Sequence, residues 1–188
     1  AQIPVKKVKD MIFQVEPFGD DSSPVRMGHA QTRFIFSEPI IIKRQDGSSN
    51  KTKKLNELIL SIHATGAKND YEPFSKGIDG SYSSSMAVFS TPSKIKGYLK
   101  NERKVEQHKL DVSEEEKTRY LVNYFKKRQK WGLATRYHTV ANNCGSGQFG
   151  VVDDAIILSL SEKDEIKSCG AIVGQYNPGM VTGALKAR

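Results

Sequence analysis

The sequence predicts an α+β fold in which an antiparallel sheet packs against a cysteine-bearing helix. Apolar and polar residues alternate with a period of two through much of the first half of the 188-residue chain, which is typical of half-buried strands. Apolar residues recur at intervals of three and four in the second half, which is typical of helices. Because the two kinds of segment are separated along the chain, the pattern favours α+β over an alternating βαβ arrangement.

Strands are predicted where the alternation is clearest. One of them carries His29, and in the next strand Ser61 and His63 lie on the face opposite to Leu60. A glycine-bearing turn, "GIDG", precedes a shorter strand. The predicted strands are residues 10–18, 25–36, 55–65, 86–89 and 104–112.

Three helices are predicted. The strongest covers residues 113–131, because Ser113 and Glu116 have the spacing of a capping box. A Thr-Pro pair begins a short helix at residues 91–102, and a buried helix runs from about Ser146 to Leu160. The apolar stripe of the strongest helix consists of Tyr120, Leu121, Tyr124 and Phe125.

The composition indicates a single domain. Hydrophobic residues make up 37% of the chain and charged residues 27%, which is enough apolar material for one core. We expect one domain over residues 1–188, with its core at about 10–176 and a basic tail at 177–188. No run of about 18 apolar residues occurs, so no membrane-spanning helix is predicted.

The formal net charge of +8 favours anionic partners such as phospholipid headgroups or acidic wall polymers. Lysine outnumbers arginine, which disfavours sequence-specific reading of DNA. No interleaving of aromatic and basic residues supports nonspecific binding of nucleic acid. The densest basic run, Lys43–Lys54, is rich in Gly, Ser and Asn, and we predict a solvated loop there, with an anion-binding patch as the alternative.

Cys144 is the strongest candidate for chemistry, because it stands where the last predicted helix begins. The N–H groups and dipole at a helix start stabilise a thiolate, and they can also hold a developing oxyanion. Gly145 and its small neighbours would let a substrate carbonyl approach the backbone. Two other interpretations stay open: Cys144 is a small buried hydrophobe, or it forms a disulfide with Cys169, which would abolish a nucleophilic role.

A cysteine nucleophile needs a nearby base, and the chain has four histidines. His29 and His63 lie on successive predicted strands, where they can face a packed helix. His108 lies in a highly charged stretch and is expected to be exposed. His138 is close to Cys144 in sequence and would reach it only if the chain turned back. Taken singly, each strand histidine is also compatible with a structural role.

Four segments occur in a recognisable order, namely "MGHAQTRF", "GIDGSYSSS", "SKIKGYLKNERKVEQHKLDVSEEEKTRYLVNYFKKRQ" and "ATRYHTVANNCGSGQ". From Phe13 to Leu160, this order resembles the N-terminal periplasmic domain of the Lnb-type lipoprotein N-acyltransferases. That family looks like a circularly permuted relative of the papain and NlpC thiol enzymes, in which the histidine strand precedes the cysteine helix. The Asn-Cys pair is similar to that of lecithin retinol acyltransferase-like proteins.

The resemblance implies that Cys144 is the nucleophile and His29 its general base. It also implies a third, orienting polar group on the strand beside the histidine strand, for which His63 is the first candidate and Ser61 the second. The residues that the resemblance implies as site-shaping or oxyanion-binding are Asn143, Gly145 and Tyr137.

These features predict an exported Cys-His thiol hydrolase or acyltransferase, periplasmic or secreted, that forms an acyl-enzyme. The expected substrate is an ester or amide of the cell envelope: an acyl chain of a lipid or lipoprotein, or a peptidoglycan amide. No cofactor or metal is expected, because the histidines lack zinc-ligand spacing, and the lysines would contact an anionic membrane surface. The alternative is a catalytically inactive envelope-binding module. The start at Ala1 is compatible with removal of a signal peptide, and equally with a cloning scar.

Overall fold

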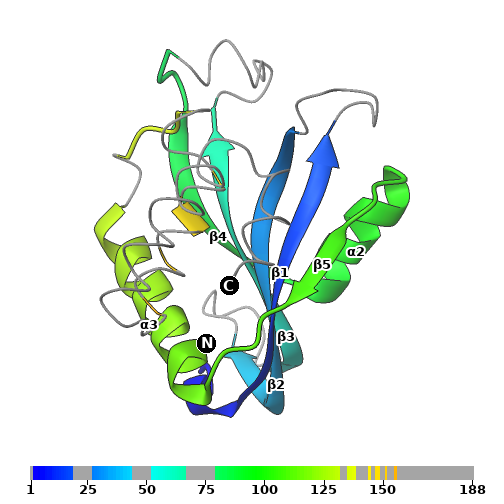
Figure 1. The fold of residues 1–188 in the computed structure, drawn as a ribbon, viewed down its shortest axis with the longest axis vertical. Coiled ribbons are helices and arrows are strands. Elements are labelled where there is room, and N and C mark those ends of the chain that lie inside the picture. Colours follow the sequence, from blue (N-terminus) through cyan, green and yellow to red (C-terminus); the bar gives the residue numbers. More distant parts are fainter. Residues whose placement is uncertain are drawn as a thin grey trace.

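The structure, a computed structural model, describes five continuous stretches and five single residues of the C-terminal part. The stretches are residues 2–18, 27–43, 52–66, 79–131 and 135–138, and the single residues are Cys144, Gly147, Gln148, Val151 and Ala155. The elements, shown in Figure 1, are η1 (Val5–Lys7), β1 (Val8–Phe18), β2 (Met27–Lys43), β3 (Thr52–Thr65), β4 (Ser83–Ser90), α2 (Thr91–Lys100), β5 (Glu106–Lys109) and α3 (Glu114–Trp131).

The five strands form one antiparallel sheet in the order β4-β3-β2-β1-β5, which confirms the predicted α+β class with an antiparallel sheet. β4 and β5 are therefore the two edges of this sheet, although only α2 and a short connection separate them in sequence. α2 crosses one face of the sheet as it joins these edges, and α3 lies on the opposite side (Figure 1).

The sheet forks at one end. The ladder between β2 and β3 stops at the pair Gln31–Ser61. The β1–β2 ladder continues as far as Phe18–Met27, and the β3–β4 ladder continues to Thr65–Ser83. The two strand pairs diverge beyond Gln31–Ser61 (Figure 1). We call this region the fork, because backbone groups of β2 that would otherwise pair with β3 are left to find other partners there.

The apolar face of the sheet carries the main core. Along β2, Ala30, Phe34 and Phe36 are buried on this face, and α3 covers it with Tyr120, Leu121 and Tyr124. The alternation predicted from sequence is thus confirmed for these strands, as is the apolar stripe of α3. The remaining core residues of this face on the strands and in the C-terminal part are Val8, Met11, Phe13, Val15, Ile40, Leu58, Leu60, Ile62, Met86, Val151 and Ala155.

The polar face of the sheet is buried as well. It carries polar side chains that are 9% exposed or less, and α2 lies over it, with the Tyr98 hydroxyl accepting a hydrogen bond from the Gln31 amide. Buried polar groups cost free energy unless they are hydrogen-bonded, so a sheet with this face buried needs a network of partners. The buried polar residues of this face are Gln14, Glu16, His29, Gln31 and Ser61.

Two predicted boundaries are wrong. β2 continues past Phe36 to Lys43 because its register to β3 shifts between Ile35 and Ile40; a bulge of this kind accommodates the proline at position 39, which cannot donate to a ladder. Both ends of the predicted loop at 43–54 are strand, since Lys43 pairs with Thr52. Residues 44–51 lie outside the described residues.

His108 is also not as expected. It lies on β5 opposite Phe13, and its side chain is only 25% exposed, so its charged neighbours in sequence do not place it in open solvent. The predicted end of the last helix, Cys169, and the basic tail at 177–188 lie outside the described residues.

The capping box of α3 makes a stability prediction. Glu116 Oε2 accepts hydrogen bonds from the Ser113 backbone N–H (2.8 Å) and hydroxyl (2.7 Å), and the Ser113 hydroxyl in turn accepts one from the Glu116 N–H (3.3 Å). We expect Ser113→Ala to lower the free energy of unfolding in urea by about 1 kcal/mol. The matched change Glu114→Ala, in the same turn, should cost about half of that or less. Equal effects would contradict the capping role.

Candidate functional site

Cys144 lies buried on the apolar face at the fork. It is helical, and its side chain is 3% exposed. It packs in a small cluster with Phe13, Val15 and Ala30, apart from the larger core. The structure records it as a thiol and not as half of a disulfide. The burial predicted for Val151 and Ala155 is confirmed, and both residues are helical, as is Cys144. The predicted helix start at Ser146, and with it the position of Cys144 relative to the first turn, lies outside the described residues.

The Cys144 sulfur contacts the backbone on both sides of His29. The Ala30 N–H points at Sγ from 3.4 Å, and Sγ lies 3.8 Å from the Gly28 carbonyl oxygen. These two groups belong to the stretch of β2 where pairing with β3 has ended. The sulfur thus takes a place that a β3 backbone group would hold in an unforked sheet.

Gln148, one helical turn after Cys144, fixes this helix on the sheet. Its amide nitrogen donates to the Leu60 carbonyl (3.0 Å), and its Oε1 accepts from the hydroxyls of Thr32 (3.1 Å) and Tyr120. All of these side chains are fully buried. Gln148 is not among the predicted site residues. A glutamine three and seven residues before the buried Val151 and Ala155, and therefore on the same apolar stripe, was the available signal.

His29 leaves β2 on the polar face, opposite to the face on which Cys144 packs. Its Nε2 lies 2.6 Å from Ser61 Oγ, and its ring centroid lies 4.5 Å from that of His63. The hydrogen-bonding partner of His29 is therefore Ser61, the second of the two candidates for an orienting group. The ring of His63 packs against that of His29 at a tilt of 42°, and its Nε2 has no hydrogen-bond partner among the described residues.

Both of these histidines are held in the neutral form. Burial lowers the pKa of His29 well below 6.5, and the charges of His63, Lys94 and Arg103 lower it further. Burial, followed by the charge of Lys94, lowers the pKa of His63 to about 4. A neutral imidazole can accept a proton, so the site can hold a base at neutral pH.

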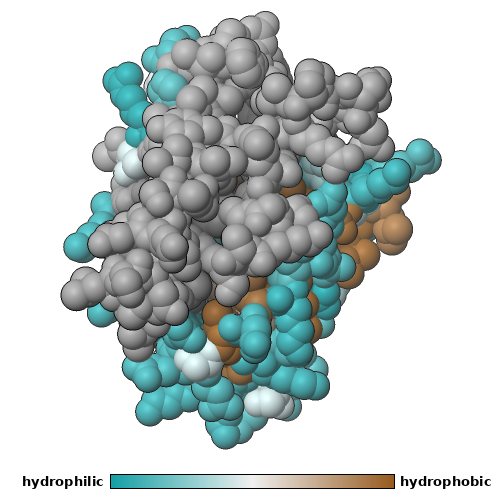
Figure 2. Space-filling model, in the orientation of Figure 1, coloured by the Kyte–Doolittle hydropathy of each residue, from teal (hydrophilic) through white to brown (hydrophobic). Residues whose placement is uncertain are grey.

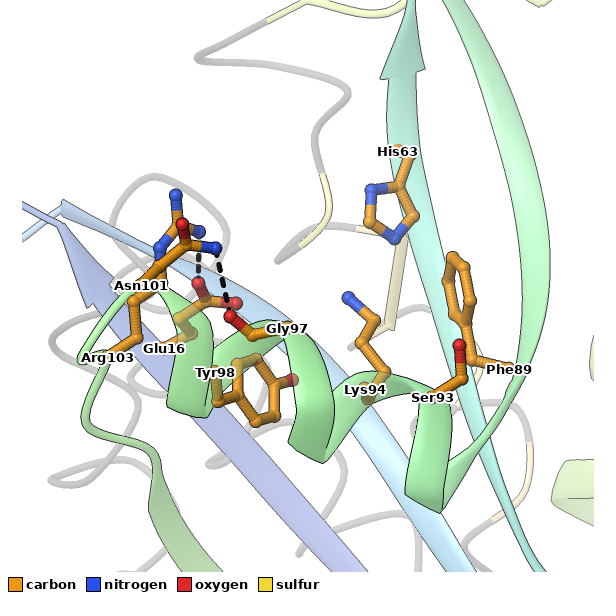
Figure 3. A pocket seen from close by; sticks show the side chains of 9 residues that line it. All are labelled: Glu16, His63, Phe89, Ser93, Lys94, Gly97, Tyr98, Asn101 and Arg103. Atoms are coloured by element: carbon orange, nitrogen blue, oxygen red, sulfur yellow. Dashed lines mark hydrogen bonds and ion pairs between the residues drawn. The ribbon is translucent and has the colours of Figure 1, made fainter.

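A pocket of about 310 Å³ opens on the polar face between α2 and the sheet. Lys94 points into it, with its ammonium 4.6 Å from the centre of the Phe89 ring, and His63 approaches from the other side (Figure 3). Arg103 reaches the same pocket and pairs with the buried Glu16. The pocket is lined by Glu16, His63, Phe89, Ser93, Lys94, Gly97, Tyr98, Asn101 and Arg103.

Of the three remaining candidate residues, the structure describes Tyr137. Asn143 and Gly145 lie outside the described residues. Tyr137 is half-buried, and its N–H donates to the Tyr82 carbonyl at 2.7 Å, beside the start of β4. Among the described residues, no three His, Cys, Asp or Glu side chains converge as metal ligands.

Residues 1–168 match the family described as the Lnb N-terminal periplasmic domain. The chain belongs to this family. The predicted periplasmic location is thereby confirmed, and so is the resemblance drawn from the order of the four sequence segments. No curated protein and no solved structure matches the chain. Within the part of the Lnb domain that the structure describes, no helix has the length and apolarity needed to cross a membrane.

The buried contacts of Gln148 predict a large effect on the stability of the Lnb domain. Gln148→Leu removes one hydrogen bond each from the Leu60 carbonyl, the Thr32 hydroxyl and the Tyr120 hydroxyl, while the two hydroxyls still bond each other. A hydrogen bond contributes about 0.5–1.5 kcal/mol, so we expect the loss of three to lower the free energy of unfolding in urea by about 2 kcal/mol or more. Gln129→Leu, at an exposed position of α3, is the control and should change stability by less than about 0.5 kcal/mol. Similar losses in both variants would show that the network stabilises nothing.

Burial of His63 predicts a stability that falls in acid. Burial lowers the pKa of His63 to about 4 in the folded protein, below its usual value of 6.5, so the unfolded chain binds the proton first as the pH falls. The contribution of His63 to the free energy of unfolding is therefore fully present above about pH 7. It falls by about 3 kcal/mol as the pH is lowered to about 4. Urea denaturation between about pH 8 and pH 4 measures it. His63→Phe, which keeps a ring against His29, should reduce the slope and leave the part that comes from His29; an unchanged slope would contradict the assignment.

Proposed function

We propose that this periplasmic domain is a thiol hydrolase or acyltransferase of circularly permuted papain-like type, with Cys144 as nucleophile and His29 as general base. One observation carries the proposal. The sulfur from the C-terminal part of the chain lies against the backbone on both sides of His29, which comes from the N-terminal part. A structural cysteine needs only an apolar pocket, whereas this one contacts the two neighbours of a neutral imidazole.

The hydrogen bond of His29 supports the assignment. Ser61 engages Nε2, the ring nitrogen remote from the main chain. Nδ1, the nitrogen nearer to the main chain, is the one left to take a proton. The Cys144 sulfur packs on the opposite face of β2, and in this proposal it meets Nδ1 across the fork, where β3 no longer pairs with β2. In the tautomer with the proton on Nε2, this nitrogen donates to Ser61 Oγ and Nδ1 is an acceptor; the proposal assigns this tautomer. Ser61 is then the positioning residue, and His63 supports the ring by packing.

The chemistry proceeds through a thioester. Nδ1 of His29 takes the proton of the Cys144 thiol, and Sγ attacks the carbonyl carbon of an envelope ester or amide. N–H groups at the start of the Cys144 helix hold the oxyanion, with Asn143, Gly145 and Tyr137 shaping the site as the family resemblance implies. The imidazolium returns its proton to the leaving alcohol or amine. Water or an amine then attacks the thioester and releases Cys144 as a thiol.

The surface of α2 supports contact with the envelope. Ile95 and Leu99, one turn apart, are 45% and 76% exposed, and Lys96 and Lys100 beside them are exposed as well. Figure 2 shows this apolar patch at the right of the view, over α2 and bordered by hydrophilic side chains. Apolar side chains framed by lysines suit the surface of an anionic membrane.

A non-catalytic envelope-binding module is the second candidate. The observation that favours it is the 3% exposure of Cys144, because a nucleophile has to meet its substrate. The two candidates differ in the reactivity of sulfur. A catalytic thiolate should react with iodoacetamide well below pH 8.5, the usual pKa of cysteine, and this reactivity should disappear in His29→Ala.

The decisive experiment is the intact mass of the protein after incubation with envelope lipids and, separately, with peptidoglycan fragments. We expect an acyl adduct that is absent from Cys144→Ser and retained in Cys169→Ser, the matched control. His29→Ala should slow adduct formation about 100-fold or more, and Ser61→Ala about 10-fold. An adduct that survives Cys144→Ser, or none with either substrate class, would reject the proposal.

A further inference from the structure

The pocket under α2 is a candidate binding site separate from Cys144. We propose that it binds a singly charged oxyanion, a phosphodiester or a carboxylate, between Lys94 and His63. The shared chemistry of these groups is one negative charge spread over two oxygen atoms. This site lies on the polar face, whereas Cys144 lies on the apolar face, so its existence does not depend on the thiol chemistry proposed above.

Lys94 is the first observation. Its ammonium points into the pocket (Figure 3) and lies over the rings of Phe89 and Tyr98, 4.6 Å and 5.8 Å from their centres. None of the carboxylates that the structure describes forms a salt bridge with it, since the neighbouring Glu16 pairs with Arg103. A partly buried cation without a paired anion is electrostatically incomplete, and an anionic ligand would complete it.

His63 is the second observation. Its Nε2 is buried and has no hydrogen-bond partner among the described residues, although His63 lines the pocket. Buried polar atoms in folded proteins nearly always have a partner. In the tautomer that carries the proton on Nε2, this nitrogen is a donor, so Nε2 and the Lys94 ammonium offer two donors to one oxyanion.

The charge and size of the pocket set the class of ligand. Lys94 and Arg103 bring two positive charges, and Glu16 brings one negative charge, which leaves one positive charge for a monoanion. The volume of about 310 Å³ is at the lower end of ligand sites, which run from roughly 300 to 1,000 Å³. A headgroup or a peptide terminus fits this volume, and the ring of Phe89 offers it an apolar wall.

The test is a titration of the full chain with two matched pairs of soluble ligands, followed by the ring resonances of His63 in NMR spectra and by calorimetry. The first pair is dihexanoyl phosphatidylglycerol, an anionic phosphodiester, and zwitterionic dihexanoyl phosphatidylcholine. The second pair is acetyl-D-alanyl-D-alanine and its neutral amide. We expect the anionic member of at least one pair to shift the His63 resonances and to bind at least about tenfold more tightly than its partner.

Two variants locate the site. Lys94→Gln should weaken anion binding about tenfold or more, whereas Lys96→Gln, two residues further along α2 and exposed, should leave it within about twofold. Cys144→Ser, which cannot form an acyl-enzyme, should bind the anion as the wild type does, so a failure of the thiol chemistry is distinguishable from a failure of this site.

The arms of the titration identify the source of the oxyanion. Binding of the lipid anion alone assigns a phosphodiester, binding of the dipeptide alone assigns a carboxylate, and binding of both supports a general oxyanion site. Absence of any His63 shift with either anion overturns the proposal. It is also overturned if Lys94→Gln and Lys96→Gln weaken binding equally, because the affinity would then come from the general positive charge of the protein.

Discussion

The alternation of side chains along β2, with both of its faces buried, is the constraint on which the rest of the structure depends. Residues at even positions, such as Ala30 and Phe34, enter the apolar core beneath α3, and those at odd positions, such as His29 and Gln31, enter a polar layer beneath α2. A slip of one residue would put glutamine and histidine into the core and phenylalanine among charges. The register of β2 is therefore strongly specified, and so is the position of His29 relative to Cys144.

The fork joins these two faces. In the paired part of the sheet, the ladder hydrogen bonds separate the apolar core from the polar layer. Beyond Gln31–Ser61 that ladder is absent between β2 and β3, and sulfur meets the free edge of β2 at Ala30 and Gly28. A sulfur atom makes weak hydrogen bonds, so it satisfies these backbone groups less well than a strand would.

The polar layer owes its stability to mutual hydrogen bonding. Gln31 donates to Gln14 at 2.9 Å, Gln14 donates to Gln107 at 3.0 Å, and Tyr98 closes the layer from α2. Such networks are costly when incomplete, and two atoms of this layer find no partner among the described residues: Gln31 Oε1 in its interior and His63 Nε2 beside the pocket. Of these two residues, His63 lines the pocket.

The sequence by itself determined the fold class, six of the helix and strand positions to within about three residues, and the capping box, because each of these is encoded in local spacing. The family followed from the order of the four segments along the chain. The sequence also named Cys144, His29 and Ser61. Only the tertiary structure decided that sulfur and imidazole lie on opposite faces of β2, that Ser61 rather than His63 bonds His29, and that Gln148 anchors the cysteine helix. These contacts join residues 32 to 116 positions apart, and no local pattern records which of two neighbouring strands, or which face, a distant side chain will reach.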